Sequence, residues 1–364
     1  MKLINGNILL LTNQLHISPS GGRELLCKLN HDMLKDIYGE RCLVLELPKN
    51  PIRSFKSIIS AFKGYIDGLS NEFITEALQQ IQAKNVDKIF VDGSNFGEFV
   101  RAVKMKFPQV QVCTFFHNVE ARFFLGALRQ TKTPRALAIL MVNYLAEKKA
   151  VRYSDKIICL NERDSQLLNR VYGRTATHIS AMALQDKFLT ADALPLNEIK
   201  EKFALFVGGT FYANLAGITW FVKHVAPHIH IKTYIVGRGF EKYKNELELD
   251  GKVEVIGEVD SLAQWYLNSH FVIAPIFDGS GMKTKVAEAL MFGKKIIGTP
   301  EAFSGYEEVV DYASEVCATS DNFIRAIENA KDDIVKSFNP ELRKLYEENY
   351  SYSAARLRLV EILN

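Results

Sequence analysis

The 364-residue sequence has few cysteines and no long apolar segment. Its five cysteines lie far apart without a Cys-x-x-Cys pair, so we expect neither a disulfide framework nor a zinc-binding cysteine cluster. The most apolar stretch, residues 136–146, is interrupted by Asn143 and is shorter than the roughly 20 residues that span a bilayer. The opening MKLINGNILLLTNQ holds a run only as long as a strand, and no cleavage site follows it. We therefore expect a cytoplasmic protein in a reducing compartment.

Several catalytic signatures are also absent. The sequence contains no Asp-x-Asp, which argues against a metal-dependent GT-A transferase. A complete Gly-x-Gly-x-x-Gly is missing as well, so a nicotinamide oxidoreductase is weakly supported. The P-loop, His-Glu-x-x-His and Gly-x-Ser-x-Gly motifs do not occur.

The composition is that of a folded protein, with 48% hydrophobic and 24% charged residues, which excludes wholesale disorder, a fibre or a coiled coil. The net charge of +3 conceals an asymmetry. Residues 1–195 contain 26 Lys and Arg against 18 Asp and Glu, whereas residues 196–364 contain 19 against 24. The chain thus has a basic half and an acidic half.

Short apolar runs alternate with segments of helical spacing along the chain. Most of the runs lack polar alternation, which is typical of strands buried on both faces of a parallel sheet. The expected strands are Ile8–Thr12, Arg41–Glu46, Lys88–Asp92, Val110–Phe116, Lys156–Leu160, Ala204–Gly208, Thr233–Gly237, Val253–Ile256, Phe271–Ile276 and Lys295–Thr299. This rhythm predicts an α/β protein of two Rossmann-like domains with parallel sheets that face a central cleft.

The periodicity fades between Ala181 and Lys202, where Pro195 interrupts it. We therefore expect an N-terminal domain over residues 1–195 and a C-terminal domain over 196–340. Residues 341–364 have the spacing of a helix, and we expect this helix to pack back on the N-terminal domain.

The segment from Phe271 to Glu308 carries the strongest signal for ligand binding. A buried strand ends at Pro275, and the loop Asp278-Gly279-Ser280-Gly281 leads into a helix that begins near Met282. Ligands of open α/β sheets bind at the carboxyl ends of strands, and a helix start offers free N–H groups to a phosphate.

Three charged residues follow this loop. Lys283 and Lys285 oppose the helix dipole unless a bound anion compensates them, and Glu288 can accept hydrogen bonds from sugar hydroxyls. A glycine turn with surface lysines and a solvated glutamate explains the same residues without any ligand. The residues alone leave both interpretations open.

The stretch GSGMKTKVAEALMFGKKIIGT, followed by Ser304-Gly305-Tyr306-Glu307-Glu308, resembles the donor-binding segment of GT-B glycosyltransferases of the family-4, or "glycosyl transferases group 1", type. Phe206-Val207-Gly208-Gly209-Thr210 and Ile235-Val236-Gly237-Arg238-Gly239 resemble the glycine turns that follow strands of their C-terminal domain. The order of segments agrees along essentially the whole chain.

The resemblance implies roles for individual residues. Glu288 matches the second glutamate of the family's E-x7-E motif, which binds the nucleotide ribose, whereas Ser280 stands where the first glutamate belongs. Sugar contacts would then come from Asp278, Ser280 or backbone amides, and residues Gly281, Met282, Lys283 and Thr284 would supply amides to the diphosphate. The family's Arg and Lys pair is not recognisable, and Arg238, Lys283 and Lys285 are the expected substitutes, with Gly209 in the donor site.

Two N-terminal segments fit the same resemblance. The loop with Gly21 and Gly22 resembles the family's glycine-rich loop, which faces the donor phosphate and the acceptor. An N-cap at Ser20 before a permissive turn is a simpler interpretation of the same residues. His117, at the end of a strand, resembles the active-site histidine that contacts the donor sugar, although a histidine there is often only structural.

The resemblance therefore implies a metal-independent, retaining hexosyltransferase without a cofactor. It would move sugar from a nucleotide-diphosphate sugar to a hydroxyl acceptor, a lipid-linked or growing saccharide of surface polysaccharide biosynthesis. A non-catalytic subunit that binds a nucleotide sugar or lipid is the main alternative, motivated by Ser280. A GT-B epimerase is a weaker one.

Basic residues cluster between Arg122 and Lys156, interleaved with apolar side chains. A solvated helical face explains this pattern, and nucleic-acid binding has no accompanying motif. The more specific hypothesis is that this region rests on anionic lipid, at the inner face of the membrane, with a lipid-linked acceptor.

Overall fold

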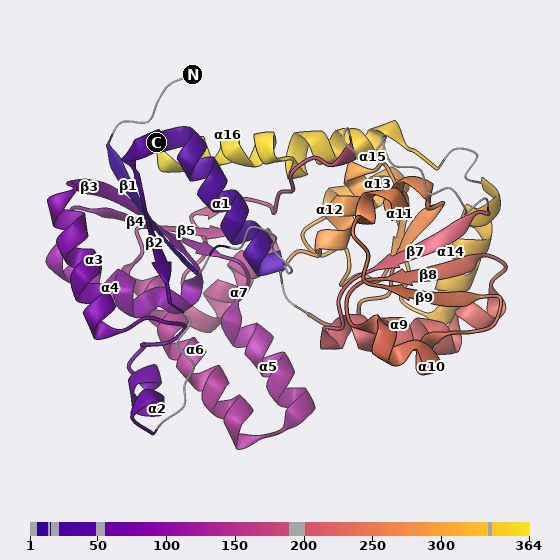
Figure 1. The fold of residues 1–364 in the computed structure, drawn as a ribbon, viewed down its shortest axis with the longest axis horizontal. Coiled ribbons are helices and arrows are strands. Elements are labelled where there is room, and N and C mark those ends of the chain that lie inside the picture. Colours follow the sequence, from indigo (N-terminus) through magenta and orange to yellow (C-terminus); the bar gives the residue numbers. More distant parts are fainter. Residues whose placement is uncertain are drawn as a thin grey trace. The chain divides into compact units, whose positions relative to one another are not determined.

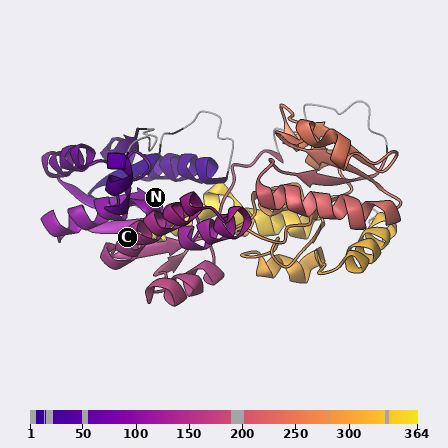
Figure 2. The same cartoon turned by 90° about the horizontal axis from the view of Figure 1, so that it is seen from below.

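The computed structural model describes residues 6–13, 15, 22–48, 55–188, 201–279, 281–333 and 337–364, with the backbone alone at residues 55, 56 and 311–313. The chain forms two compact units, one of residues 1–182 with 355–364 and one of residues 183–354. The structure thus divides the chain earlier than the expected seam after residue 195, and the second unit extends beyond the expected boundary at 340. Each unit is a sheet with helices on both faces (Figures 1 and 2).

The first unit contains a six-stranded parallel sheet. Its strands, in spatial order, are β2 (Cys42–Leu47), β1 (Asn7–Asn13), β3 (Val86–Asp92), β4 (Gln111–Phe116), β5 (Lys156–Cys159) and β6 (His178–Ile179). Its helices are α1 (Gly22–Tyr38), α2 (Phe55–Phe62), α3 (Asn71–Ala83), α4 (Gly97–Lys106), α5 (Glu120–Thr131), α6 (Pro134–Tyr153) and α7 (Glu162–Tyr172), with short 3₁₀ turns at Gly39–Arg41 and Ser94–Phe96.

The second unit repeats this arrangement. Its sheet has the spatial order β12 (Glu315–Val316), β11 (Ile296–Gly298), β10 (Phe271–Ala274), β7 (Phe203–Val207), β8 (Lys232–Val236) and β9 (Val253–Gly257). Its helices are α9 (Tyr212–His224), α10 (Lys244–Leu247), α11 (Leu262–Asn268), α12 (Thr284–Met291), α13 (Glu307–Ala313), α14 (Ser320–Asp333) and α15 (Pro340–Leu345), with 3₁₀ turns at Ala226–His228 and Phe240–Tyr243.

Strand alternation separates the two faces of the first sheet. Leu9 and Leu11 of β1, with Ile89 and Val91 of β3, pack in one apolar cluster with side chains of α3 and α4. Successive side chains of a strand point to opposite faces, so Asp92 belongs to the other face, where α1 lies. The last residue of β3 is therefore directed at α1 rather than at the α3–α4 core.

The sheet elements agree well with the sequence-based expectations. All ten expected strands are present, with ends displaced by no more than about two residues. The two further strands, β6 and β12, have two residues each, too short to show a pattern. The predicted α/β fold with two parallel sheets is confirmed.

The C-terminal segment is not the single helix expected over residues 341–364. After α15 a π-helical turn covers Tyr346–Tyr350, and α16 (Tyr352–Leu363) begins after a break at Ser351. The break arises because Ser351 forms a parallel bridge with Leu184, whose N–H donates to the carbonyl of Tyr350. Residues 355–364 then belong to the first unit.

The end of α16 is held by two lysines of the first sheet. Lys88 Nζ donates to the carbonyl of Leu363, and Lys156 Nζ donates to that of Ile362. Cations at a helix C-terminus satisfy free carbonyls and interact favourably with the helix dipole. No helix in the described part of the chain combines the length and the apolar character needed to cross a membrane.

Candidate functional site

Two strand-end loops of the second unit lie against each other. The loop after β7 contains Gly208 and Gly209, and the loop after β8 contains Gly237 and Arg238. Gly237 has φ +145°, and a Cβ there would lie 1.8 Å from the carbonyl oxygen of Gly208, so only glycine permits this contact. Gly209 and Arg238 are both exposed.

Lys285 of α12 is buried beneath the first of these loops. Its Nζ donates to Asn214 Oδ1 over 2.9 Å and lies 4.2 Å from the centroid of the Phe206 ring. A Cβ placed on Gly208 would approach this Nζ to 3.2 Å, so the ammonium group lies directly beside the β7 loop. Burial lowers the pKa of Lys285 to about 7.

The hydrogen bond of Lys285 goes to an uncharged group. Among the described residues Lys285 forms no ion pair, and the neutral amide of Asn214 accepts its hydrogen bond. The carboxyl group of Glu288, one turn later, raises the pKa of Lys285, but this effect is smaller than the lowering by burial. A buried ammonium group without a carboxylate partner is costly, and a bound anion would remove that cost.

The start of α12 follows two glycines with left-handed backbone. Gly279 has φ +139° and Gly281 has φ +63°, and both lie in the loop that ends at the N-cap, Lys283. Lys283 differs from Lys285, because its Nζ pairs with Glu301 Oε1 at 2.9 Å and donates to the carbonyl of Gly281. The first N–H groups of a helix have no intrahelical acceptor, so Thr284 and its neighbours present donors beside both lysines.

Glu288 accepts a hydrogen bond of 2.8 Å from the hydroxyl of Tyr266 through Oε2. Burial raises the pKa of Glu288, although the bond from Tyr266 and the nearby Lys187 and Lys285 oppose this shift. Tyr266 is itself held by stacking on Phe292, with ring centroids 5.3 Å apart. One oxygen of the Glu288 carboxyl group is thus held in place by Tyr266.

The other residues predicted for the sugar-donor site differ in how deeply they are buried, and some lie outside the described residues. Asp278 is partly buried, and its carboxylate accepts from the N–H of Gly279 and from the hydroxyl of Tyr212. Met282 is buried in the same loop. Ser280 and Gly21 lie outside the described residues, and Gly22 is the exposed first residue of α1.

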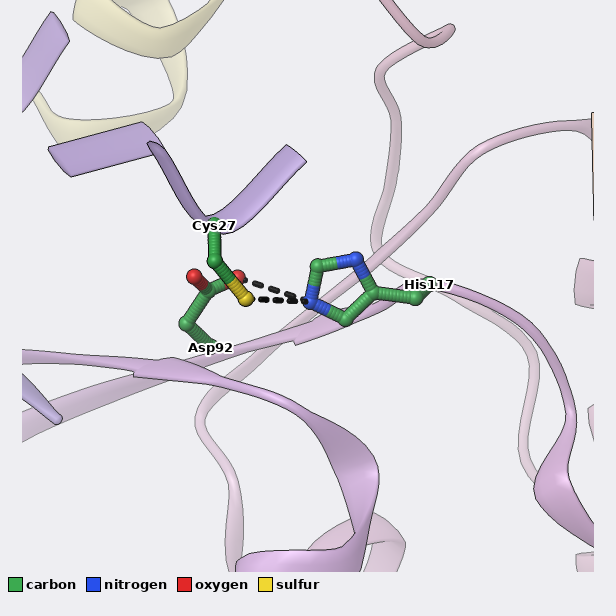
Figure 3. A group of neighbouring side chains, drawn as sticks. All are labelled: Cys27, Asp92 and His117. Atoms are coloured by element: carbon green, nitrogen blue, oxygen red, sulfur yellow. Dashed lines mark hydrogen bonds and ion pairs between the residues drawn. The ribbon is translucent and has the colours of Figure 1, made fainter. Parts of the chain in front are cut away.

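The first unit has a separate polar cluster at the carboxyl ends of its strands. Asp92, at the end of β3, is completely buried and accepts hydrogen bonds from Asn30 Nδ2 at 2.9 Å and Thr12 Oγ1 at 3.1 Å. His117, after β4, places Nε2 2.9 Å from Asp92 Oδ1, and Cys27 Sγ of α1 lies 3.8 Å from the same nitrogen (Figure 3). The predicted residue His117 is therefore part of a buried constellation.

Asp92 remains a carboxylate in this setting. Burial would raise its pKa, but attraction to His117 together with hydrogen bonds from His117 and Asn30 outweighs burial and lowers the pKa below its ordinary value. In the same cluster burial raises the pKa of the Cys27 thiol. The cluster thus combines an ionised acid with a protonated thiol.

An acid and an arginine adjoin His117. Glu120, the first residue of α5, lies 3.9 Å from Arg23 of α1. Burial raises the pKa of Glu120 to about 7, partly offset by Arg23 and reinforced by the nearby Glu147. Glu120 is therefore a titrating group near neutral pH.

Glu147 of α6 fixes the backbone beside these residues. It is completely buried, and it accepts from the backbone N–H groups of Glu120 and Ala121 as well as from the hydroxyls of Ser94 and Tyr172. Glu147 thereby caps the N-terminus of α5 from a distance in sequence and holds the segment that carries His117 and Glu120.

Sequence reasoning missed Asp92, Arg23, Cys27 and Glu147. Asp92 had a local signal, since it ends a predicted buried strand, as His117 follows one. The others lie within helices, where nothing in the neighbouring sequence distinguishes them. A metal ion would find candidate ligands in Cys27, Asp92 and His117, whose ligand atoms lie within 4.8 Å of one another.

Part of the second unit matches a known protein family. Residues 201–333 match the model of a family described as glycosyl transferases group 1. No curated protein matches the chain.

Solved structures resemble the chain over nearly its whole length. Sucrose-phosphate synthase from Thermosynechococcus elongatus has a TM-score of 0.71 and 15% identity, covering 97% of this chain and 98% of that chain. HepE of Anabaena in complex with UDP has a TM-score of 0.68 and 14% identity, covering 98% and 99%. WaaG, a glycosyltransferase involved in lipopolysaccharide biosynthesis, has a TM-score of 0.61 and 11% identity, covering 98% and 99%.

At these identities the structural likeness establishes the fold, which is GT-B, and the family model matches residues 201–333 of the second unit. The GT-B fold expected from the sequence is confirmed, and the family match includes the segment Phe271–Glu308 that carried the resemblance.

Proposed function

We propose that this chain is a group 1 glycosyltransferase. It transfers a hexosyl group from a nucleotide-diphosphate sugar to a hydroxyl acceptor and retains the anomeric configuration without a metal ion. The observation that carries the proposal is Lys285, a buried lysine beside a glycine loop and a helix start, whose hydrogen-bond partner is a neutral amide. That arrangement suits a phosphate group.

Phosphate binding explains the placement of the charges around α12. A diphosphate beside the β7 loop would neutralise the ammonium of Lys285 and restore its pKa toward the ordinary range. It would also accept hydrogen bonds from the free N–H groups at the start of α12. Lys283 is already paired with Glu301, so it contributes less unless the phosphate displaces that carboxylate.

In the transfer step the bond between the anomeric carbon and the phosphate oxygen breaks, and its electron pair passes to the nucleotide diphosphate. Lys285 and the helix-start N–H groups stabilise the negative charge that develops there, because they are already oriented before the reaction. The acceptor oxygen forms the new bond to the anomeric carbon and passes its proton to the departing phosphate oxygen. No step requires a carboxylate at position 280.

Glu288 fits a role in binding the ribose. Oε2 is committed to Tyr266, while the rest of the carboxyl group remains to accept from ribose hydroxyls. Similar structures that were solved in complex with UDP and with UDP-glucose support a nucleotide-sugar partner for this chain.

The acceptor assignment rests on the first unit. The exposed cations are Arg129 of α5, Lys132 between the two helices, and Arg135, Lys148 and Arg152 of α6. Exposed apolar side chains accompany them: Leu137 and Met141 on α6, and Ile58, Ile59 and Phe62 on α2, which packs against α6 through Ala61. Exposed apolar groups interspersed with cations suit an anionic lipid surface, and thus a lipid-linked or growing surface saccharide as acceptor.

Glu288→Ala tests the donor site. Hydrogen bonds to a charged group contribute about 1.5–3 kcal/mol, so we expect UDP affinity to fall on the order of 10- to 100-fold in calorimetry. Glu315→Ala is the matched control, since Glu315 pairs with Lys295 away from α12. Unchanged UDP binding by a folded Glu288→Ala protein would contradict the assignment.

Turnover distinguishes an enzyme from a binding subunit. The proposal predicts release of free nucleotide from a nucleotide sugar, faster when an acceptor is present, and a product with retained configuration by NMR. Tight nucleotide-sugar binding without release would support the non-catalytic alternative, and an altered free nucleotide sugar would support an epimerase.

The membrane assignment has its own test. Sedimentation with vesicles containing phosphatidylglycerol should deplete the wild-type protein from solution, and Leu137→Ser with Met141→Ser should weaken this binding. Leu357→Ser on α16 is the control, because Leu357 is even more exposed, at 62%. Equal binding to neutral and anionic vesicles would exclude the proposed surface.

A further inference from the structure

Lys283 and Glu301 form an ion pair at the start of α12. Lys283 Nζ lies 2.9 Å from Glu301 Oε1 and also donates to the carbonyl of Gly281 over 3.0 Å. The two side chains are only 12% and 22% exposed, so solvent screens their attraction less than at the open surface. The chain thus supplies Lys283 with a carboxylate of its own.

The backbone around this ion pair is held by hydrogen bonds. Thr299, directly after β11, donates through its hydroxyl to the carbonyl of Ile276, which follows β10. The hydroxyl of Tyr306, a completely buried residue, donates to the carbonyl of Lys283 over 3.0 Å. These bonds tie the loop that carries Glu301 to the end of β10 and to the start of α12. An exchange of partners by the Glu301 carboxylate therefore needs rotation of its side chain alone.

Lys283 lies beside the loop at which we propose that the phosphate binds. A Cβ placed on Gly279 would lie 3.7 Å from Lys283 Nζ. Burial is the main cause of the lowered pKa of Lys285, and the positive charge of Lys283 lowers it further, so the two ammonium groups interact. A diphosphate carries negative charge on both phosphates and is attracted to both lysines. Glu301 repels the same diphosphate while it holds one of them.

We propose that Glu301 is an internal competitor of the nucleotide diphosphate: the phosphate displaces Glu301 from Lys283 on binding, and Glu301 takes Lys283 back when the nucleotide leaves. This inference rests on the proposed function and adds the regulation of its donor site. Product release limits the turnover of many enzymes, so a carboxylate that reclaims Lys283 shortens the residence of the nucleotide diphosphate after transfer. Glu301 thus lowers the affinity of the site and speeds release.

Two other roles of Glu301 predict different results. In a positioning role Glu301 would hold Lys283 in place for the phosphate, which brings two negative groups to one ammonium, and loss of its charge would weaken UDP binding. In a sugar contact Glu301 would accept hydrogen bonds from hydroxyls of the donor, and loss of its charge would weaken binding of UDP-glucose but not of UDP. The internal competitor alone predicts tighter binding of UDP.

Glu301→Gln removes the charge and keeps the size of the side chain. We expect UDP and inorganic pyrophosphate to bind this variant roughly three- to tenfold more tightly than the wild type in calorimetry, with slower dissociation of UDP in stopped-flow measurements. Glu315→Gln is the matched control, since Glu315 pairs with Lys295 at the edge of the sheet, and it should leave both affinities unchanged. Circular dichroism verifies that each variant is folded.

A double variant separates displacement from a general relief of negative charge. Lys283→Met combined with Glu301→Gln should bind UDP no more tightly than the wild type, because the gain depends on the release of Lys283. A gain that persists without Lys283 overturns the inference, since weaker repulsion alone then explains it.

The remaining outcomes separate the inference from the proposed function. Unchanged or weaker UDP binding by a folded Glu301→Gln protein overturns the inference and leaves the proposed donor site in place. Weaker binding of UDP-glucose with unchanged binding of UDP also overturns it and identifies a sugar contact. If neither UDP nor pyrophosphate binds the wild type, the proposed function fails and the inference fails with it.

Discussion

The two units differ in how their buried charges are compensated. In the first unit Asp92 and Glu147 each accept several hydrogen bonds from within the unit, and Glu120 lies beside Arg23. In the second unit Lys285 is also buried, yet its hydrogen bond goes to the neutral amide of Asn214. The buried acids of the first unit thus have several polar partners each, whereas Lys285 has one neutral partner among the described residues.

This difference underlies the proposal that Lys285 binds a ligand, whereas Asp92 and Glu147 hold segments of the first unit together. A buried charge with all its partners holds segments together, and removing one partner leaves the others unsatisfied. A buried charge without a countercharge destabilises the empty protein and gains most when a ligand of opposite sign arrives. The four predictions that follow test this contrast, from the largest expected effect to the smallest.

Asp92→Ala should lower the free energy of unfolding by about 3–5 kcal/mol, because it leaves His117, Asn30 and Thr12 without their shared acceptor. Lys285→Met should not lower it, since methionine fills a similar volume without burying a charge. Urea unfolding followed by circular dichroism measures both. Equal destabilisation by the two substitutions would remove the contrast between the units.

Glu120→Gln should alter the pH dependence of stability. The pKa of Glu120 is raised to about 7 from its ordinary 4.5, so between these values the native state binds more protons than the unfolded state. Wild-type stability therefore falls as pH rises through this window, by as much as about 3 kcal/mol at about 1.4 kcal/mol per pKa unit.

The Glu120→Gln protein lacks this contribution. Its unfolding free energy, measured in urea at pH 5 and pH 8, should decrease less than that of the wild type. Identical pH dependence of the two proteins would show that Glu120 titrates normally.

Lys285→Met should weaken UDP binding by about 10- to 100-fold, the loss of one charge-assisted interaction of about 1.5–3 kcal/mol. Calorimetry gives the affinity. Lys295→Met is the matched control, because Lys295 pairs with Glu315 and should leave UDP affinity unaltered. An equal loss in both variants would indicate a general charge effect instead of a phosphate site.

Arg238→Ala should have the smallest effect. Arg238 is exposed, and exposed charges contribute about 0–1 kcal/mol, so UDP affinity should fall by at most about fivefold. A loss as large as that of Lys285→Met would mean that Arg238 is a principal phosphate ligand and that exposure does not distinguish the two cations.

The sequence predicted those parts of the fold that depend on local patterns. Buried parallel strands appear as short apolar runs, which is why all ten expected strands are found in the structure. The break at Ser351 was missed because its cause, the bridge to Leu184, lies far away in the sequence.

The candidate site was predictable to the same extent. Lys285 was identified from its place at a helix start after a glycine loop and His117 from its place at a strand end, together with the resemblance to a known family. Their partners, Asn214 and Asp92, come from other elements, so no spacing in the sequence indicates which side chain meets which. The compensation of charge, which separates the two units, is therefore a property of the folded chain alone.

Proton uptake on nucleotide binding tests the central claim most directly. With its pKa lowered to about 7, Lys285 is mostly neutral at pH 8 and must gain a proton when a diphosphate binds beside it. Calorimetry of UDP binding at pH 8, in two buffers of different ionisation enthalpy, should report uptake approaching one proton per UDP in the wild type and none in Lys285→Met. Binding without proton uptake, or the same uptake in both proteins, would contradict the assignment of Lys285 as the buried lysine that binds the phosphate.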